Sequence, residues 1–363
     1  MTGTSVRWCG CGAYANPTGN RRASGRSRAA TRGSPGRSSR LASATRTSDD
    51  WTVLGFVAPT DHGWYQFLRA RPDISEVNFW RPGGTPFKAI QPGAPFFFKL
   101  KRQHNAIGGF GLFTRAERLP VWRAWDVFGQ ANGTRDEHDL LVRLDRLGGR
   151  DSQGLGRNRM IGCIAITEPV FFAPDEWVAV PNNWARNIVS GRTEDLARGE
   201  GLRMWSECLE RAAARTDIAA DWAVDALDAQ RAGKPMLITP RLGQASFRLA
   251  VLDAYGQQCA VTTEHSLPVI DAAHIRPWAV GGSHSIPNGV PLRRDLHRLF
   301  DLGYVTIGAD MRFAVSRRLR DDYANGRVYY ELDGREIRTP ASEALRPDSE
   351  ALAWHEGEVF LGR

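Results

Sequence analysis

Two histidines, an asparagine and an aspartate stand close together in the C-terminal third of the sequence. They are His274, Asn288, His297 and Asp301, with 13 residues between His274 and Asn288 and eight between Asn288 and His297. An apolar run precedes His274 and an amphipathic run begins at His297, so the spacing predicts two strands joined by a loop and followed by a short helix. An imidazole titrates near neutral pH and suits proton abstraction from water. His297 and Asp301 are four residues apart on one helical face and suit coordination of a divalent ion beside a phosphate.

The letters around these residues resemble the HNH endonuclease family. The resemblance rests on the H-x13-N-x8-H spacing, on the opening A-A-H-I-R-P-W at 272–278 and on the close L-H-R-L-F-D-L-G at 296–303. It covers about residues 241–320, with a looser match at Trp354 and His355. The subgroup it resembles is bacterial and lacks zinc-binding cysteine pairs.

The resemblance implies a C-terminal ββα-metal (HNH) domain over residues 241–340 and a role for each matching residue. His274 takes the position of the general base. Asn288 takes the position that braces the loop between the strands and orients the base, and His297 that of a metal ligand on the helix. With Asp301 beside it, the expected ion is Mg²⁺ or Mn²⁺, and Zn²⁺ and Ni²⁺ remain alternatives.

The sequence departs from this family at the position before the first histidine. Many HNH proteins carry an acidic or histidine metal ligand there, and this chain has Ala273. Asp271 points to the same side of a strand and is a partial substitute. Otherwise the ion keeps only His297 and Asp301, with water and phosphate completing its coordination. Cys259 has no second cysteine nearby, so no structural zinc is expected.

Arginines surround the motif and are candidates for phosphate contacts. The candidates are Arg276, Arg293, Arg294 and Arg298. A helix expected at 241–256 adds Arg241 and Arg248, although a solvated helix face explains these two equally well. His284 lies in the loop between the strands; it is a candidate for a phosphate contact, and a plain loop residue is the preferred interpretation.

The net charge of +8 belongs to the N-terminal segment. Residues 1–48 contain nine arginines and no Asp, Glu or Lys, so residues 49–363 carry about −1. The segment has almost no large apolar residues and is expected to be a disordered basic tail. One interpretation is that it binds nucleic acid through counterion release. The other is that arginine is simply the common basic residue throughout this chain, or that the segment is translated from upstream of the true start.

Residues 49–190 predict a small β-barrel with helical insertions, because short apolar runs alternate with Pro and Gly. The segment resembles the PUA-like superfamily, which includes EVE and ASCH domains. The resemblance is carried by Trp64, N-F-W at 78–80, F-K at 87–88, the P-G turn at 92–93 with F-F-F-K after it, and the glycine-rich strand at 107–111. It implies a pocket that holds a nucleobase, often a modified and flipped one.

Trp80 and Asn78 are the candidates for contacting that base. Trp80 lies at a strand end beside a Pro-Gly-Gly loop and is expected at the surface, where its ring can stack on a base. Asn78 can read the polar edge of the base. The alternative is that the aromatic side chains here are simply barrel core.

The predicted fold class is therefore α+β. An N-terminal PUA-like barrel is followed by a helical connector at 191–240, where the apolar residues recur with a helical period. The HNH domain then follows, and residues 341–363 form a C-terminal extension.

The expected function is metal-dependent cleavage of DNA, directed to modified double-stranded DNA by the N-terminal domain, as in restriction. The main alternative is a nucleic-acid-binding protein with a weak or inactive HNH domain, and a further one is an enzyme acting on RNA. A double-strand cut favours a homodimer. Five scattered cysteines and no secretory or membrane-spanning apolar run predict a bacterial cytoplasmic protein.

Overall fold

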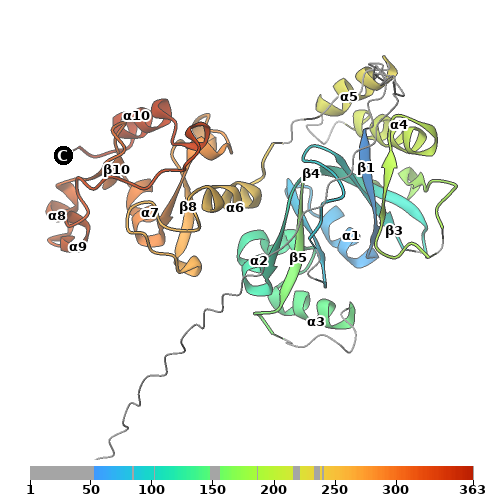
Figure 1. The fold of residues 1–363 in the computed structure, drawn as a ribbon, viewed down its shortest axis with the longest axis horizontal. Coiled ribbons are helices and arrows are strands. Elements are labelled where there is room, and N and C mark those ends of the chain that lie inside the picture. The colour runs from blue at the N-terminus through green and yellow to red at the C-terminus, as the bar shows by residue number, and fades with distance from the viewer. Residues whose placement is uncertain are drawn as a thin grey trace, which may run out of the picture. The chain divides into compact units, whose positions relative to one another are not determined.

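The apolar runs of the N-terminal half form one seven-stranded sheet with helices on both faces (Figure 1). The computed structural model describes residues 53–83, 86–101, 103–147, 156–185, 187–215, 221–232, 238 and 241–362. The predicted disordered tail at 1–48 lies outside these residues.

The helices and strands of the N-terminal half are β1 (Leu54–Thr60), α1 (His62–Arg69), β2 (Glu76–Arg81), β3 (Pro95–Leu100), β4 (Ala106–Pro120), α2 (Val121–Phe128), α3 (Glu137–Leu147), β5 (Met160–Phe171), β6 (Val178–Ala179), β7 (Arg192–Asp195), α4 (Gly199–Ala213) and α5 (Asp221–Arg231). Those of the C-terminal half are α6 (Gln244–Ala254), β8 (Ile270–His274), β9 (Gly289–Arg293), α7 (Arg294–Asp301), β10 (Val305–Ile307), β11 (Phe313–Val315), α8 (Arg318–Tyr323), α9 (Arg327–Tyr330) and α10 (Ser349–Glu358).

The consecutive phenylalanines of β3 show how the sheet is covered on both faces. Side chains alternate along a strand, so Phe96 and Phe98 enter a core with α1, α2 and α3. Phe97 points the other way, into a core with α4 and α5. All three rings are fully buried. The run of aromatic residues therefore belongs to a three-layer arrangement in which both sheet faces are dry.

The strand order is β2-β5-β4-β3-β1-β7, with β6 paired to β4. Strands β1 and β3 run parallel, whereas the other pairs are antiparallel. Within the described residues this path has β2 and β7 at its ends, so the closed barrel expected from the sequence is not confirmed.

The segment expected to connect the domains belongs in large part to the sheet domain. Residues 192–195 form β7, which pairs with β1, where only helices were expected. Helix α4 then packs Met204 and Trp205 onto the face that carries Phe97. The sequence R-T-E-D of β7 is polar and did not indicate a strand. An edge strand is held mainly by backbone hydrogen bonds and needs no apolar pattern.

The C-terminal half contains the predicted order of strand, loop, strand and helix. Strands β8 and β9 pair antiparallel, with His274 opposite Gly289, and α7 begins directly after β9. Helix α10 packs Leu352 into the same core, and its His355 is only 2% exposed. Part of the expected extension at 341–363 is thus built into the core of this half.

Helix α6 is shared between the two halves. Ala245 and Leu249 belong to the core of the sheet domain, whereas Phe247 and Val251 belong to the core of the C-terminal half. Residues 48–363 accordingly form one compact unit. Nowhere in the described chain is there a helix with the length and hydrophobicity needed to span a membrane.

A buried carboxylate fixes the start of α6. Glu76 of β2 accepts hydrogen bonds from the backbone N–H groups of Ala245 and Ser246, at 2.8 and 3.1 Å. A carboxylate is stabilised at this end of a helix because the unpaired N–H groups and the helix dipole point at it. Gly243 is required for this approach, since a Cβ there would collide with the carboxylate. Burial raises the pKa of Glu76, and the hydrogen bonds from Ser246 and Ala245 oppose that rise.

Candidate functional site

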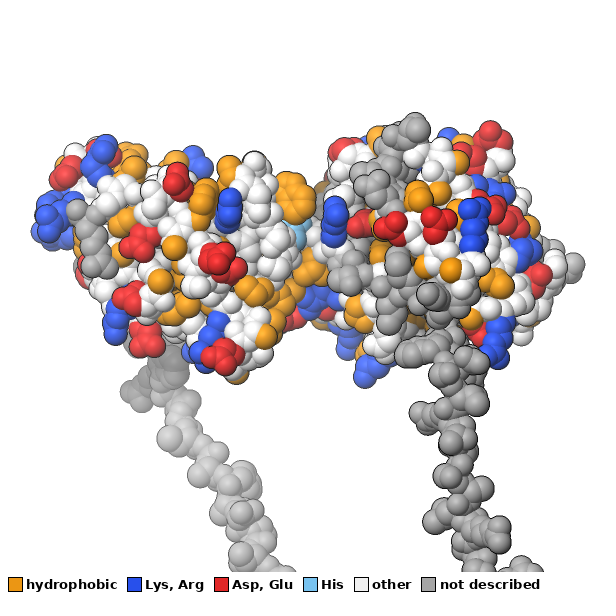
Figure 2. All heavy atoms as spheres, turned by 90° about the horizontal axis from the view of Figure 1, so that it is seen from above, with side chains coloured by type: hydrophobic (Ala, Val, Ile, Leu, Met, Phe, Trp, Pro, Cys, Tyr) orange, Lys and Arg blue, Asp and Glu red, His pale blue; other side chains and the backbone are white. Residues whose placement is uncertain are grey.

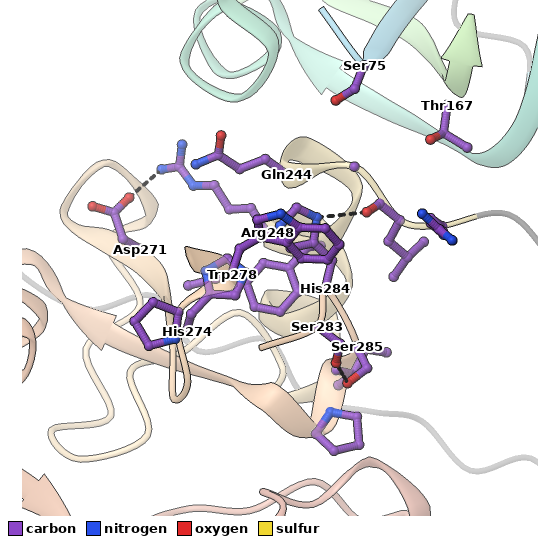
Figure 3. Close-up of a pocket in the computed structure, with 18 of the residues that line it drawn as sticks. Ser75, Thr167, Gln244, Arg248, Asp271, His274, Trp278, Ser283, His284 and Ser285 are labelled. Atoms are coloured by element: carbon purple, nitrogen blue, oxygen red, sulfur yellow. Dashed lines mark hydrogen bonds and ion pairs between the residues drawn. The ribbon is translucent and has the colours of Figure 1, made fainter. Parts of the chain in front are cut away.

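A cleft of about 1430 Å³ brings the motif residues together with one edge of the sheet domain (Figure 3). His274, His297 and Asp301 line it on the side of the C-terminal half. Ser75 and Thr167 line it from the sheet domain. The cleft is therefore lined both by the predicted catalytic and metal-binding residues and by residues of the N-terminal domain.

His274 is held as a neutral imidazole at the end of β8. Its ring stacks on Phe247 of α6, with the centroids 4.0 Å apart and the planes 13° apart. Burial, followed by charge repulsion from His284 and His297, lowers the pKa of His274 to about 4. Its Nε2 atom is buried and has no hydrogen-bond partner. At neutral pH the ring is therefore uncharged, with one of its two nitrogens unprotonated.

Asn288 braces the loop that follows His274. Its Oδ1 accepts from the backbone N–H of Arg276 at 2.9 Å, and its Nδ2 donates to the carbonyls of Arg276 and Ser283 at 2.9 and 2.8 Å. The side chain is 5% exposed. Since both ends of the amide are occupied, Asn288 positions the loop and takes no part in proton transfer.

The imidazole of His297 stands between two carboxylates. Its Nδ1 is 4.0 Å from an oxygen of Asp271, and its Nε2 is 3.6 Å from an oxygen of Asp301. The two acids therefore face different ring nitrogens. No group of three or more His, Cys, Asp or Glu side chains in the described part of the chain could hold a metal ion. His297 Nε2 and Asp301 would supply one imidazole and one carboxylate to an ion, a donor set that suits an ion which keeps several waters, as Mg²⁺ does.

The four arginines predicted to contact phosphate differ in whether a carboxylate of the protein already pairs with them. Arg293 pairs with Asp295 through two contacts of 2.7 Å, and Arg294 pairs with acidic side chains as described below. Arg276 donates to the carbonyl of Val280 at 2.9 Å and lies over the Trp354 ring. Arg298 is exposed. Among these four, Arg276 and Arg298 make no ion pair with any described residue.

Charges on the surface are mixed. On the face drawn in Figure 2, acidic and basic side chains are interspersed over both halves. This agrees with the net charge of about −1 for residues 49–363. The face drawn therefore carries no patch of a single sign that would attract nucleic acid from a distance.

The expectation that Trp80 lies at the surface is wrong. Trp80 is 9% exposed, and its Nε1 donates to the carbonyl of Asn132 at 2.8 Å. Asn78 is fully buried, bonded through Nδ2 to Asn132 at 2.8 Å and through Oδ1 to the N–H of Ile164 at 3.1 Å. Both side chains are part of the sheet-domain core, as the alternative interpretation held, because the turn that carries Asn132 packs over them.

Two residues of the loop between the strands were not recognised as part of the site. Trp278 is 61% exposed and lines the cleft. The ring of His284 lies 5.1 Å from Trp278 and 5.1 Å from His274. His284 Nδ1 lies 2.8 Å from the carbonyl of Leu242, which can only accept, so Nδ1 carries the proton and Nε2 is left free (Figure 3). The signal for Trp278 was present in the P-W letters after His274.

Comparison with known proteins places the motif in a family. Residues 259–308 match a family model described as HNH endonuclease. A solved structure of ASCH from Zymomonas mobilis is similar at 12% identity and a TM-score of 0.27, covering 41% of this chain and 92% of that one. A mutant of the same protein is similar at 11% identity and a TM-score of 0.26, covering 41% and 94%.

No curated protein is significantly similar to this chain. The predicted HNH resemblance is confirmed over residues 259–308, which carry His274, Asn288 and His297 and match the HNH endonuclease family.

Proposed function

We propose that this protein is a divalent-metal-dependent endonuclease that cuts DNA. The observation that carries the proposal is His274, a neutral and unbonded imidazole in the same cleft as His297 and Asp301. These three residues belong to or border the loop and helix of a segment that matches HNH endonucleases. A base beside a candidate ion site is the arrangement that phosphodiester hydrolysis needs.

Each residue has a defined role in this proposal. His274 accepts a proton from water, whose oxygen attacks phosphorus and displaces the leaving oxygen. Asn288 keeps the loop after His274 in place. His297, through Nε2, and Asp301 would hold the ion. When bound, a divalent ion supplies positive charge that stabilises the charge developing on the phosphate oxygens.

The sheet domain is proposed to choose the DNA that is cut. The hydroxyl group of Ser75 lies on the side of the cleft opposite the motif, is exposed, and is available to a base or sugar (Figure 3). In this proposal the sheet domain selects a modified base in double-stranded DNA. A double-strand cut would use two copies of the chain. Trp80 and Asn78 are excluded from that role by their burial.

A cleavage assay tests the proposal. Plasmids with and without modified cytosines are incubated with the full chain and Mg²⁺ or Mn²⁺, beside matched RNA. Wild type should nick DNA, and His274→Ala should lose a factor of about 10²–10⁴ in rate. His265→Ala is the matched control, because His265 is exposed and does not line the cleft.

The alternative is a binding protein with an inactive HNH segment. It predicts that wild type and His274→Ala both shift DNA in a gel while neither nicks it, and that outcome refutes the nuclease proposal. Cutting of RNA in place of DNA would refute the assignment of DNA as substrate.

A further inference from the structure

Four charged side chains from four elements form a closed ring beside His297. Arg248 of α6 contacts an oxygen of Asp126 at 2.9 Å and an oxygen of Asp271 at 2.8 Å. Arg294, at the start of α7, contacts the other oxygen of Asp126 at 3.4 Å and the other oxygen of Asp271 at 3.2 Å. Each guanidinium thus joins the same two carboxylates. Three of the residues belong to the C-terminal half, whereas Asp126 comes from α2 of the sheet domain.

One member of the ring, Asp271, lies beside the candidate metal ligand His297. Asp271 is the member that faces Nδ1 of His297, at 4.0 Å, while Nε2 faces Asp301. A carboxylate at one ring nitrogen orients a histidine whose other nitrogen holds a metal. The separation of 4.0 Å is longer than a hydrogen bond, so the negative charge of Asp271 acts electrostatically, favouring a proton on Nδ1 of His297 and orienting the ring.

The balance of charges within this ring indicates the role of Asp126. The ring has two guanidiniums and two carboxylates, and its net charge is zero. Without Asp126, both guanidiniums would be left to Asp271 alone. They would draw its oxygens away from the imidazole and add a positive charge beside the place where a cation binds.

We propose that Asp126 is a positioning residue of the nuclease site. It binds Arg248 and Arg294 so that Asp271 remains available to orient His297, and the sheet domain thereby completes the metal-binding end of the cleft. This inference rests on the proposed function. It goes further in assigning a residue of the N-terminal half to the site.

Metal affinity measured without DNA tests the proposal. Mn²⁺ binding to the full chain is followed by electron paramagnetic resonance for wild type, Asp126→Asn, and the double variant Asp126→Asn with Arg294→Gln. Asp126→Asn should weaken Mn²⁺ binding about tenfold, as loss of such supporting contacts typically does. The double variant removes one charge of each sign and should recover much of the affinity.

A matched control and a second measurement separate positioning from folding. Asp145→Asn removes an aspartate from α3 that pairs with Arg159 at 3.6 Å, away from the ring, and should bind Mn²⁺ as wild type does. Ring-nitrogen NMR should show one tautomer for His297 in wild type, protonated on Nδ1 beside Asp271, and a mixture in Asp126→Asn.

The proposal is overturned if Asp126→Asn binds Mn²⁺ as tightly as wild type, or if the double variant binds more weakly than Asp126→Asn. It is also overturned if wild type binds no Mn²⁺. If wild type binds Mn²⁺ with the expected dependence on Asp126 but cuts no DNA, the proposed function fails while the role of Asp126 stands.

Discussion

Trp278 offers a direct test of where DNA lies on this protein. The residue sits in a short helical turn at 278–280, between His274 and Asn288, and is 61% exposed. Its loop is rigid, because Asn288 bonds to both sides of it and a Cβ at Gly282 would collide with the carbonyl of Arg276. A large ring held out from a braced loop, at the edge of the cleft, is suited to stacking on a base. We expect Trp278→Ala to weaken DNA binding.

The size of the effect follows from the exposed area of Trp278. A buried tryptophan removes about 250 Å² from water, so the exposed part of this ring is roughly 150 Å². A base on one face covers about half of that, and at about 25 cal/mol per Å² the contact contributes roughly 2 kcal/mol. The dissociation constant should therefore rise about 30-fold.

The assay is fluorescence anisotropy of a labelled duplex in a His274→Ala background, where DNA stays intact. Trp278→Phe keeps an aromatic ring and should retain much of the affinity. Val280→Ala is the control, because Val280 belongs to the same turn and is 46% exposed. An unchanged affinity in Trp278→Ala, or an equal loss in Val280→Ala, would show that no base stacks on Trp278.

Two further changes test the parts of the site that position His274 and α7. Asn288→Asp replaces two N–H donors by an oxygen that faces the carbonyls of Arg276 and Ser283. The free energy of unfolding measured in urea should fall by about 3 kcal/mol, and DNA cutting should fall with it. Unchanged stability would contradict the bracing role. Burial lowers the pKa of His355 to about 4 from 6.5, so the neutral form stabilises the fold above pH 6.5 and this contribution is lost toward pH 4. That loss is at most about 3 kcal/mol, and His355→Gln should flatten it; an equal acid sensitivity in the variant would contradict this assignment.

The motif could be predicted from sequence because its geometry is local. His274, Asn288 and His297 lie on a strand, a loop and a helix that follow one another, so their spacing fixes how they meet. The ring around Asp271 could not be predicted in the same way. Asp126 and Arg248 are far apart in the chain, and only the packing of α2 beside α6 brings them together.

The errors about Trp80 and Asn78 come from burial that the sequence does not show. A strand with one wet face shows alternating polar and apolar letters, whereas this sheet is covered on both faces. Trp80 and Asn78 both point into protein, and Asn132 accepts a hydrogen bond from Nε1 of Trp80 and from Nδ2 of Asn78. The sequence shows an aromatic residue beside a loop, and it does not show which distant asparagine will accept its N–H.

The distribution of charge bears on how this cleft can hold DNA. Of the arginines near the motif, Arg248, Arg293 and Arg294 are held by carboxylates, and the net charge of residues 49–363 is about −1. Phosphate attraction from the folded part is therefore limited to a few free side chains such as Arg298. Affinity must then depend more on contacts that need no net charge, and the exposed ring of Trp278 is the largest such contact beside His274. Arg248 and Arg294, which are unavailable to phosphate, instead join Asp126 of the sheet domain to Asp271 beside His297.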